Sequence, residues 1–225
     1  MRNESLRYIL GVLLGDGYRW IDRSRSPKAE RHWRVGLHAK DEKFVHTFAF
    51  HLSKLLNRNY TVWKEKRGLY RVDCSSKLLY DLKEANINKV EESAKEEPEA
   101  FLKGIFDSDG CGSVFTRKFP NKAYHYPIVS FTNTRKELVE LVTKLLRSIG
   151  ISAKIYLKRC RGNPCFDRWK STTDQYQLII TKRDDVLRYM KKIGFRKRVS
   201  PSFLKLVSTS RAKELEEVIC EDCEA

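Results

Sequence analysis

A ten-residue pattern occurs twice in this chain of 225 residues and constrains its fold more than any other feature. The first copy is Tyr8–Gly17 (YILGVLLGDG), and the second, Phe101–Gly110 (FLKGIFDSDG), lies 93 residues further on. Each copy has apolar residues around a glycine, then a small residue, and ends in Asp-Gly. Because self-similarity at a long period indicates a duplicated architecture, the repeat predicts two similar halves related by a pseudo-two-fold axis.

The segments after the two copies also follow one order. Alternating apolar and polar residues predict pairs of strands, and apolar residues spaced three or four apart predict helices. The first half has strands within 18–37, a helix over 41–56, strands within 60–74 and a helix over 77–85. The second half has strands within 113–131, a helix over 135–149, strands within 153–181 and a helix over 184–193. We expect an α+β fold of two αββαββα halves with the motif helices packed at the centre.

Composition places the boundary between the halves. The segment from residue 91 to residue 99 is rich in Glu and Lys, and Pro98 suits the first turn of the second motif helix. We therefore predict a first half over residues 1–88, a linker over 89–97, a second half over 98–206 and a C-terminal tail over 207–225. The end of the chain, from residue 213 to residue 225, is acidic and is expected to form a frayed helix.

Small residues on the two motif helices predict that these helices contact each other. Gly11 and Gly15 are four residues apart and share one helical face, as do Gly104 and Ser108 in the second copy. Side chains this small let two helix backbones approach closely. A single copy would be read more simply as a buried helix that ends at a C-terminal glycine. The second copy favours a pair of helices packed side by side.

An acid precedes the last glycine of each copy, Asp16 in the first and Asp109 in the second. If the helices are parallel, both carboxylates emerge at the end where unpaired helix carbonyls already present negative partial charge. Negative charges gathered in this way repel one another when no cation is bound, and they favour the binding of a divalent cation. Mg²⁺ prefers hard oxygen ligands and is bound by one or two carboxylates. The sequence therefore predicts that Asp16 and Asp109 hold catalytic metal ions.

Charge indicates the partner. Lys and Arg number 45 against 29 Asp and Glu, a surplus of 16 positive charges, so nucleic acid is the expected ligand. The sequence has no apolar run of membrane-spanning length and no signal peptide, so we expect a soluble, intracellular monomer. Six cysteines indicate free thiols in a reducing compartment more than disulfides. A zinc site from Cys160, Cys165, Cys220 and Cys223 is the less favoured alternative.

The motif pair, the repeated order of elements and the charge together resemble the LAGLIDADG homing endonucleases from about residue 5 to residue 206. The resemblance implies that Asp16 and Asp109 share Mg²⁺ ions, which Ca²⁺ could replace without turnover. The main-chain carbonyls of Gly15 and Ser108 are then further ligands. Asp107 fills the family's first acidic position, where the first copy has Leu14, and is expected to be structural.

The resemblance also implies the reaction and its helpers. Metal-dependent hydrolysis would cut both DNA strands across the minor groove at a long, pseudo-palindromic or asymmetric target and leave short 3′ overhangs, as in intron homing. The expected polar and basic helpers are Lys40, Asn133 and Lys197, with Lys89 as a weaker counterpart of Lys197. At the positions beside Lys40 and Asn133, Ala39 and Thr134 depart from the family's common pattern.

DNA contacts are expected from the outer faces of two antiparallel four-stranded sheets that form a saddle. In the first hairpin, alternation predicts that Trp20, Val35 and Leu37 point to the core. The outward residues predicted for the first half are Arg19, Arg23, Arg25, Arg34, His38, Lys64, Lys66, Arg71 and Asp73. Those predicted for the second half are Arg117, Lys118, Ser130, Thr132, Lys154, Lys158, Gln175 and Gln177. A register error of one residue would exchange the two faces.

Two other functions fit the same fold and charge. The protein could be an RNA maturase that assists intron splicing, or a sequence-specific DNA-binding regulator that does not cut. Loss of one motif acid would have favoured the regulator, whereas both acids are present. An endonuclease is therefore the preferred interpretation.

Overall fold

The structure is a computed structural model that describes residues 2–22, 32–162, 164–166, 169–170, 172–197 and 199–209. The predicted DNA contacts Arg23 and Arg25 lie outside these residues, as do Cys220, Cys223 and the expected helix of the tail. The chain divides into two compact units, one of residues 1–109 and 195–198 and the other of residues 110–194 and 199–225. The predicted boundaries of the two halves remain a prediction.

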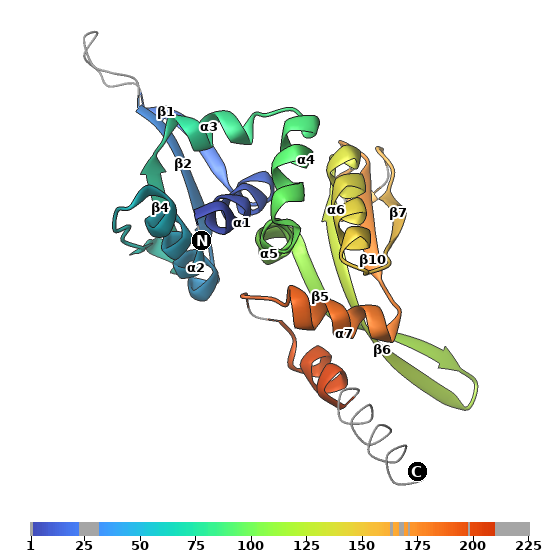
Figure 1. The fold of residues 1–225 in the computed structure, drawn as a ribbon. Helices are drawn as coiled ribbons and strands as arrows, with labels where there is room; N and C mark the ends of the chain where they lie inside the picture. Colours follow the sequence, from blue (N-terminus) through green and yellow to red (C-terminus); the bar gives the residue numbers. More distant parts are fainter. Residues whose placement is uncertain are drawn as a thin grey trace, which may run out of the picture. The chain divides into compact units, whose positions relative to one another are not determined.

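The first unit contains both motif helices and one sheet (Figure 1). Its four strands are antiparallel in the order β1-β2-β4-β3. The strands are β1 (Tyr18–Asp22), β2 (His32–Ala39), β3 (Trp63–Lys64) and β4 (Tyr70–Ser75), with a 3-10 turn, η1 (Lys66–Gly68), before β4. The helices are α1 (Arg2–Leu14), α2 (Glu42–Leu56), α3 (Lys77–Lys83), α4 (Ile87–Glu96) and α5 (Pro98–Asp109).

The core of the first unit lies between its sheet and helices α1, α2 and α3. Val35 and Leu37 of β2 are fully buried there, as predicted, together with Phe44 and Phe48 of α2. Asp41 accepts a hydrogen bond from the Phe44 amide at 3.0 Å and thereby caps α2 at its N-terminus. The apolar stripe predicted over residues 41–56 thus sets which face of the sheet is covered.

Helix α4 occupies most of the segment that was expected to be a linker. Asn86 caps it by accepting the Lys89 amide at 3.0 Å. Val90 and Ala94, four residues apart, are buried, and α4 contacts α5. Two apolar residues at helical spacing suffice for packing a helix in this segment, which is otherwise rich in Glu and Lys.

The second unit repeats the same order of elements around its own antiparallel sheet, β5-β6-β10-β7. The strands are β5 (Gly110–Phe119), β6 (Lys122–Asn133), β7 (Lys154–Arg159) and β10 (Gln175–Ile180). Helices α6 (Lys136–Ser148) and α7 (Arg183–Lys192) contact one face of this sheet. Val129, Phe131, Leu178 and Ile180 are fully buried on that face.

The second unit also contains elements that the sequence did not predict. A small hairpin of β8 (Pro164–Phe166) and β9 (Trp169–Lys170) lies in the connection between β7 and β10. A further helix spans residues 201–209, past the predicted end of the second half, and Phe203 within it is fully buried. The two antiparallel four-stranded sheets and the repeated helices confirm the predicted α+β fold class. Among the described residues, no helix is long and apolar enough to cross a membrane.

Candidate functional site

Helices α1 and α5 pack against each other at backbone distance, within the first unit (Figure 1). A Cβ atom placed on Gly11 would lie 2.4 Å from the Phe101 carbonyl oxygen, and one placed on Gly104 would lie 2.1 Å from the Tyr8 carbonyl oxygen. No side chain larger than hydrogen fits at either position. The prediction that small residues bring the two motif helices together is confirmed.

The same contact continues to the ends of the helices, where the two acids lie. A Cβ on Gly15 would meet Ser108 Oγ at 2.0 Å and Asp109 Oδ2 at 3.1 Å. The Asp16 amide donates a hydrogen bond to Ser108 Oγ at 2.5 Å. Asp109 is therefore beside Gly15, the neighbour of Asp16 in the chain. The structure brings together all four residues that were predicted as metal ligands.

The donor set at this point fits a hard divalent cation. It offers two carboxylates, of which Asp16 is exposed and Asp109 is half-buried, and the main-chain carbonyls at two helix ends. The partial negative charge of both helix ends adds to that of the carboxylates. Among the described residues no group of three or more His, Cys, Asp or Glu side chains could hold a metal ion. Any metal here would complete its shell with carbonyl oxygens, water or a bound phosphate.

Asp107 has the structural surroundings that were expected of it. It is 1% exposed, and its Oδ2 accepts a hydrogen bond from the Tyr8 hydroxyl at 3.0 Å. Its Oδ1 accepts the Arg196 amide at 2.6 Å. Burial raises the pKa of this carboxyl, while the two hydrogen bonds lower it. Asp107 thus fastens the segment 195–197 to helix α5.

That segment brings Lys197 to the site. Its Nζ donates a hydrogen bond to the Ser108 carbonyl oxygen at 2.6 Å, so the predicted basic helper is one residue from Asp109. The ammonium group and a metal ion would both be attracted to this carbonyl. Lys197 is thereby placed to hold or exchange a proton next to the site.

Lys83 is a basic residue at the site that the sequence reasoning missed. Its Nζ donates to the Gly17 carbonyl oxygen at 2.5 Å and also to the Leu13 carbonyl oxygen. It therefore lies at the end of α1 as Lys197 lies at the end of α5. Lys89, proposed as the first-half counterpart, is instead exposed on α4. The sequence did hold a signal for it. Lys83 ends the helix that follows the fourth strand of the first half, and Lys197 follows the corresponding helix, α7, of the second half.

The other two predicted helpers follow the second strand of each hairpin. Lys40 is exposed directly after β2. Asn133 ends β6, and its Oδ1 accepts the Arg135 amide at 2.9 Å, which holds the start of α6. Their catalytic roles remain predictions.

Strand register decides which predicted DNA contacts share a face of the first sheet. Trp20 pairs with Arg34, and Arg19 pairs with Val35 of the core. Opposite residues of antiparallel strands point to the same side. Trp20 is therefore on the outer face with Arg34, which corrects the expectation that it points to the core. Arg19 lies on the helix-covered side, where it forms an ion pair with Glu84 at 2.7 Å. The alternation in β1 was assigned one residue out of register.

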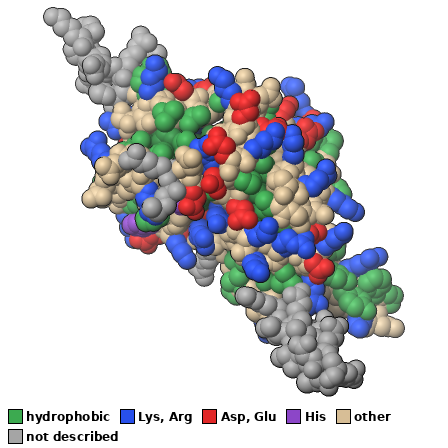
Figure 2. Space-filling view, viewed as in Figure 1, with side chains coloured by type: hydrophobic (Ala, Val, Ile, Leu, Met, Phe, Trp, Pro, Cys, Tyr) green, Lys and Arg blue, Asp and Glu red, His purple; other side chains and the backbone are tan. Residues whose placement is uncertain are grey.

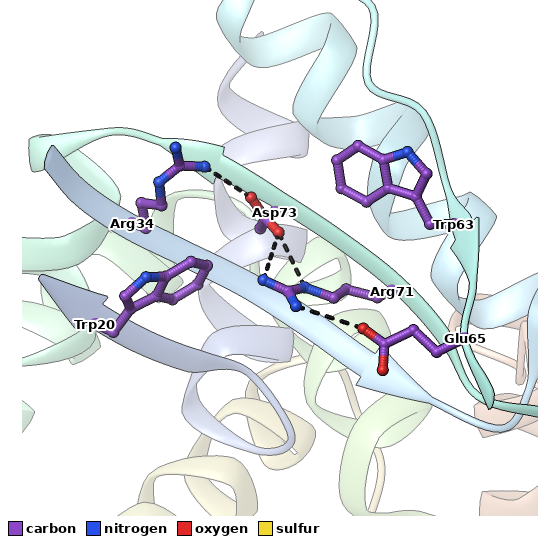
Figure 3. A pocket seen from close by; sticks show the side chains of 6 residues that line it. All are labelled: Trp20, Arg34, Trp63, Glu65, Arg71 and Asp73. Atoms are coloured by element: carbon purple, nitrogen blue, oxygen red, sulfur yellow. Dashed lines mark hydrogen bonds and ion pairs between the residues drawn. The ribbon is translucent and has the colours of Figure 1, made fainter. Parts of the chain in front are cut away.

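The outer face of the first sheet contains an open cup of about 540 Å³ (Figure 3). It is lined by Trp20, Arg34, Trp63, Glu65, Arg71 and Asp73. His38 is on the same face, because it pairs with Arg71, and its Nε2 is 3.1 Å from Glu65 Oε2. Lys66 lies in η1 and is exposed. Lys64 pairs with Tyr70, which packs against the core, so Lys64 lies on the helix-covered side and not on the outer face where it was expected.

In the second unit, most predicted contacts share the sheet face opposite α6 and α7. Ser130 pairs with Cys111 and Ile179, and Thr132 pairs with Gln177, which in turn pairs with Tyr156. By the same alternation Arg117, Lys154, Lys158 and Gln175 belong to this face. Lys118 pairs with Ala123 and points to the other side. Lys158 Nζ donates to Thr132 Oγ1 at 3.5 Å.

The tip of the β5–β6 hairpin adds aromatic residues to this face. Arg117 lies over the Phe119 ring at 4.9 Å, and Lys122 lies over the Tyr124 ring at 4.9 Å. Across the face drawn in Figure 2, Lys and Arg side chains are spread among acidic ones. Aromatic and basic side chains interleaved on a strand face suit contact with nucleic acid.

The thiols that the structure describes fit the expectation of free cysteines. Cys74 is buried, and burial raises its pKa to about 12. Cys111 and Cys160 are exposed and are not joined in a disulfide.

Residues 96–194 match the family described as LAGLIDADG-like domain, and the first motif copy lies outside that match. Two curated relatives come from Methanocaldococcus jannaschii. Uncharacterized protein MJ0314 is 32% identical over 177 residues, 75% of this chain and 61% of the relative. Uncharacterized protein MJ0398 is 28% identical over 199 residues, 86% of this chain and 67% of the relative. The chain thus spans about three fifths to two thirds of the length of these relatives.

Solved structures share the fold over nearly the whole chain. Mesophilic variants of the homing endonuclease I-DmoI align with a TM-score of 0.60 and 22% identity, over 91% of this chain and 97% of theirs. I-DmoI in complex with DNA and Mn aligns with a TM-score of 0.60 and 21% identity, over 86% of this chain and 98% of that chain. The I-LtrWI LAGLIDADG homing endonuclease bound to target DNA aligns with a TM-score of 0.63 and 8% identity, over 97% of this chain and 92% of that chain.

Proposed function

We propose that this chain, whose residues 96–194 match the LAGLIDADG-like domain family, is a site-specific endonuclease that hydrolyses both strands of a DNA target with the help of divalent metal ions. The expected target is long and pseudo-palindromic or asymmetric, since the two sheets present different residues at corresponding positions. The expected products carry short 3′ overhangs, and the biological setting is intron homing.

One observation carries this proposal: both motif acids are present at the apposed ends of α1 and α5. Asp16 is bound through its amide to Ser108 Oγ at 2.5 Å, and the carboxylate of Asp109 lies beside Gly15. Keeping two carboxylates at two helix ends is electrostatically unfavourable without a cation. A scaffold that only bound DNA would have no use for them.

Asp16, Asp109 and the carbonyls of Gly15 and Ser108 would hold the Mg²⁺ ions. When bound, these ions lower the pKa of a water molecule and neutralise charge on the phosphate. The chain's own residues perform the remaining tasks. Lys197 and Lys83 hold protons at the Ser108 and Gly17 carbonyls, each one residue from a motif acid, and Lys40 presents a further ammonium group after β2. These cations stabilise the negative charge that develops on the scissile phosphate.

DNA binding is assigned to the outer faces of the two sheets. The first sheet would use Arg34, His38 and Arg71, with Asp73 holding the two arginines, and the second would use Ser130, Thr132, Lys158 and Gln177 along with the hairpin tip. Strand faces of this kind enter the major groove, where base edges differ for every base pair. DNA-bound neighbours of the same fold support this assignment.

Incubation of the protein with a library of candidate intron-insertion sites tests the proposal. With Mg²⁺ we expect double-strand cuts at one site or a few related sites, and with Ca²⁺ binding without cuts. Sequencing the ends would identify the overhangs. Tight RNA binding without Mg²⁺-dependent cutting of any DNA would identify a maturase instead, and specific DNA binding without cutting would identify a regulator.

A further inference from the structure

The cup on the first sheet contains an acid that is almost fully enclosed by cations. Asp73 has a side chain only 7% exposed, and its Oδ1 accepts a hydrogen bond from Arg34 Nη1 at 3.1 Å. Its Oδ2 accepts both Nε and Nη2 of Arg71 at 3.0 Å (Figure 3). Both oxygens of this carboxylate already accept hydrogen bonds from arginine, so it is little available to an incoming ligand. Its effect is to fix the positions of the two guanidinium groups.

Arg71 also contacts a second carboxylate and lies beside two aromatic rings. Glu65 Oε1 accepts its Nη1 at 3.4 Å, and the rings of Tyr18 and Trp20 lie 6.0 Å and 5.5 Å from its guanidinium carbon. The side chain is nevertheless 36% exposed at the open cup. Flat rings on one side and carboxylates on two edges fix the plane of the guanidinium.

A count of donors shows what this plane can still bind. A guanidinium has about five N–H donors, one on Nε and two on each terminal nitrogen. Asp73 takes the Nε donor and one on Nη2, and Glu65 takes one on Nη1. One N–H therefore remains on Nη1 and one on Nη2. These two donors lie on the edge of the guanidinium that neither carboxylate occupies, and together they form a fork.

The charges of the cup indicate what this fork binds. Arg34 and Arg71 are balanced by Asp73 and Glu65, so the cup has no surplus positive charge to attract a phosphate. Two carboxylates beside the fork would repel one. A guanine edge is uncharged and presents O6 and N7 as adjacent acceptors in the major groove, and Arg matches them with two parallel hydrogen bonds.

We propose that Arg71 reads a guanine of the DNA target through its Nη1 and Nη2 donors, and that Asp73 and Glu65 are the positioning residues that hold it. This inference rests on the proposed function, because it needs duplex DNA on the outer face of the sheet. Trp63, on the edge strand β3 and 50% exposed, also lines the cup.

Selection from a randomised pool of duplex DNA tests this inference without any cleavage. The full chain is allowed to bind the pool in Ca²⁺, and the bound molecules are sequenced. The variants are Arg71→Gln, Asp73→Asn and Glu65→Gln, with Lys54→Gln on the exposed surface of α2 as a control for the loss of one charge. Thermal unfolding of each variant shows whether it is folded. If Asp73→Asn is not folded, Glu65→Gln still reports on positioning.

We expect the native chain to enrich a motif with guanine at one position. Arg71→Gln should reduce the preference for guanine there by about tenfold or more and leave the other positions unchanged. Asp73→Asn and Glu65→Gln should reduce the preference at the same position by a smaller factor. A purely structural role of Asp73 would lower affinity or stability without changing the preference at one position.

Three results would overturn the inference. If Arg71→Gln weakens binding to all sequences equally and reduces the slope of log affinity against log salt by about one, Arg71 contacts phosphate. If the native motif is unchanged in all three variants, the guanine is read elsewhere or not at all, and the proposed function still stands. If the native chain enriches no motif, the proposed function fails together with this inference.

Discussion

The amide of Asp16 donates a hydrogen bond to the hydroxyl of Ser108 at 2.5 Å, which joins the end of α1 to the last turn of α5. This bond lies between the two predicted metal-binding acids, because Asp109 is the next residue after Ser108 and its carboxylate lies beside Gly15. The distance between the acids therefore depends on the packing of two helices and not on a flexible loop. A site built in this way is rigid before any ion or substrate binds.

The packing of the motif helices should be intolerant of a single methyl group. Gly11→Ala and Gly104→Ala would place Cβ 2.4 Å and 2.1 Å from carbonyl oxygens of the facing helix, where backbone atoms cannot move aside cheaply. We expect each to lower the free energy of unfolding by roughly 1–3 kcal/mol, although alanine favours helices more than glycine does. Urea unfolding measures the loss. Lys43→Ala on the exposed side of α2 is the control and should stay within about 0.5 kcal/mol of the native chain.

Lys83 should contribute to stability as well as to the site. Its ammonium group binds the carbonyls of Leu13 and Gly17, and a methionine in its place would leave those carbonyls without this donor. We expect Lys83→Met to lower the free energy of unfolding by about 1–2 kcal/mol and to reduce the rate of cleavage more than DNA affinity. Lys83→Arg should restore most of the stability. A variant with native stability and native cleavage would show that Lys83 has no part in the site.

His51 should make the protein less stable in mild acid. Its ring stacks on Tyr8 at 4.1 Å, its Nδ1 is 3.1 Å from Ser5 Oγ, and burial lowers its pKa from 6.5 to about 4. Since the folded pKa is the lower one, the unfolded chain binds more protons between about pH 6.5 and pH 4, and stability falls as the pH falls through that range. Guanidinium unfolding at pH 7 and pH 4.5 measures this loss, which we expect to be up to about 3 kcal/mol. His51→Gln should remove most of it, and an equal pH dependence in that variant would assign the loss to other groups.

The double motif and the periodicity of the chain predicted the fold because they describe packing directly. Gly11 and Gly104 predicted a close helix pair, and Val35 and Leu37 predicted the covered face of the first sheet, as observed. Trp20 was assigned to the wrong face because β1 is short, and a two-residue period over five residues leaves the register open.

The parts of the site that the sequence did not predict depend on long-range contacts. Lys83 reaches the carbonyls of Leu13 and Gly17, 70 and 66 residues earlier in the chain, and Arg196 reaches Asp107, 89 residues away. No local pattern encodes such pairs. Helix α4 was missed for a different reason, since only two of its residues, Val90 and Ala94, are buried in a segment that is otherwise rich in Glu and Lys.

Cleavage by the native chain and by two motif variants is the most direct test of the central claim. Asp16→Asn and Asp109→Asn keep the size of each side chain and remove the charge that holds the cation. At a site cut by the native chain in Mg²⁺, each variant should lose double-strand cleavage by a factor of at least about 10² while its DNA affinity in Ca²⁺ changes by less than about tenfold. Double-strand cleavage at the native rate by either variant would contradict the account, because Asp16 and Asp109 would then not be the metal-binding acids.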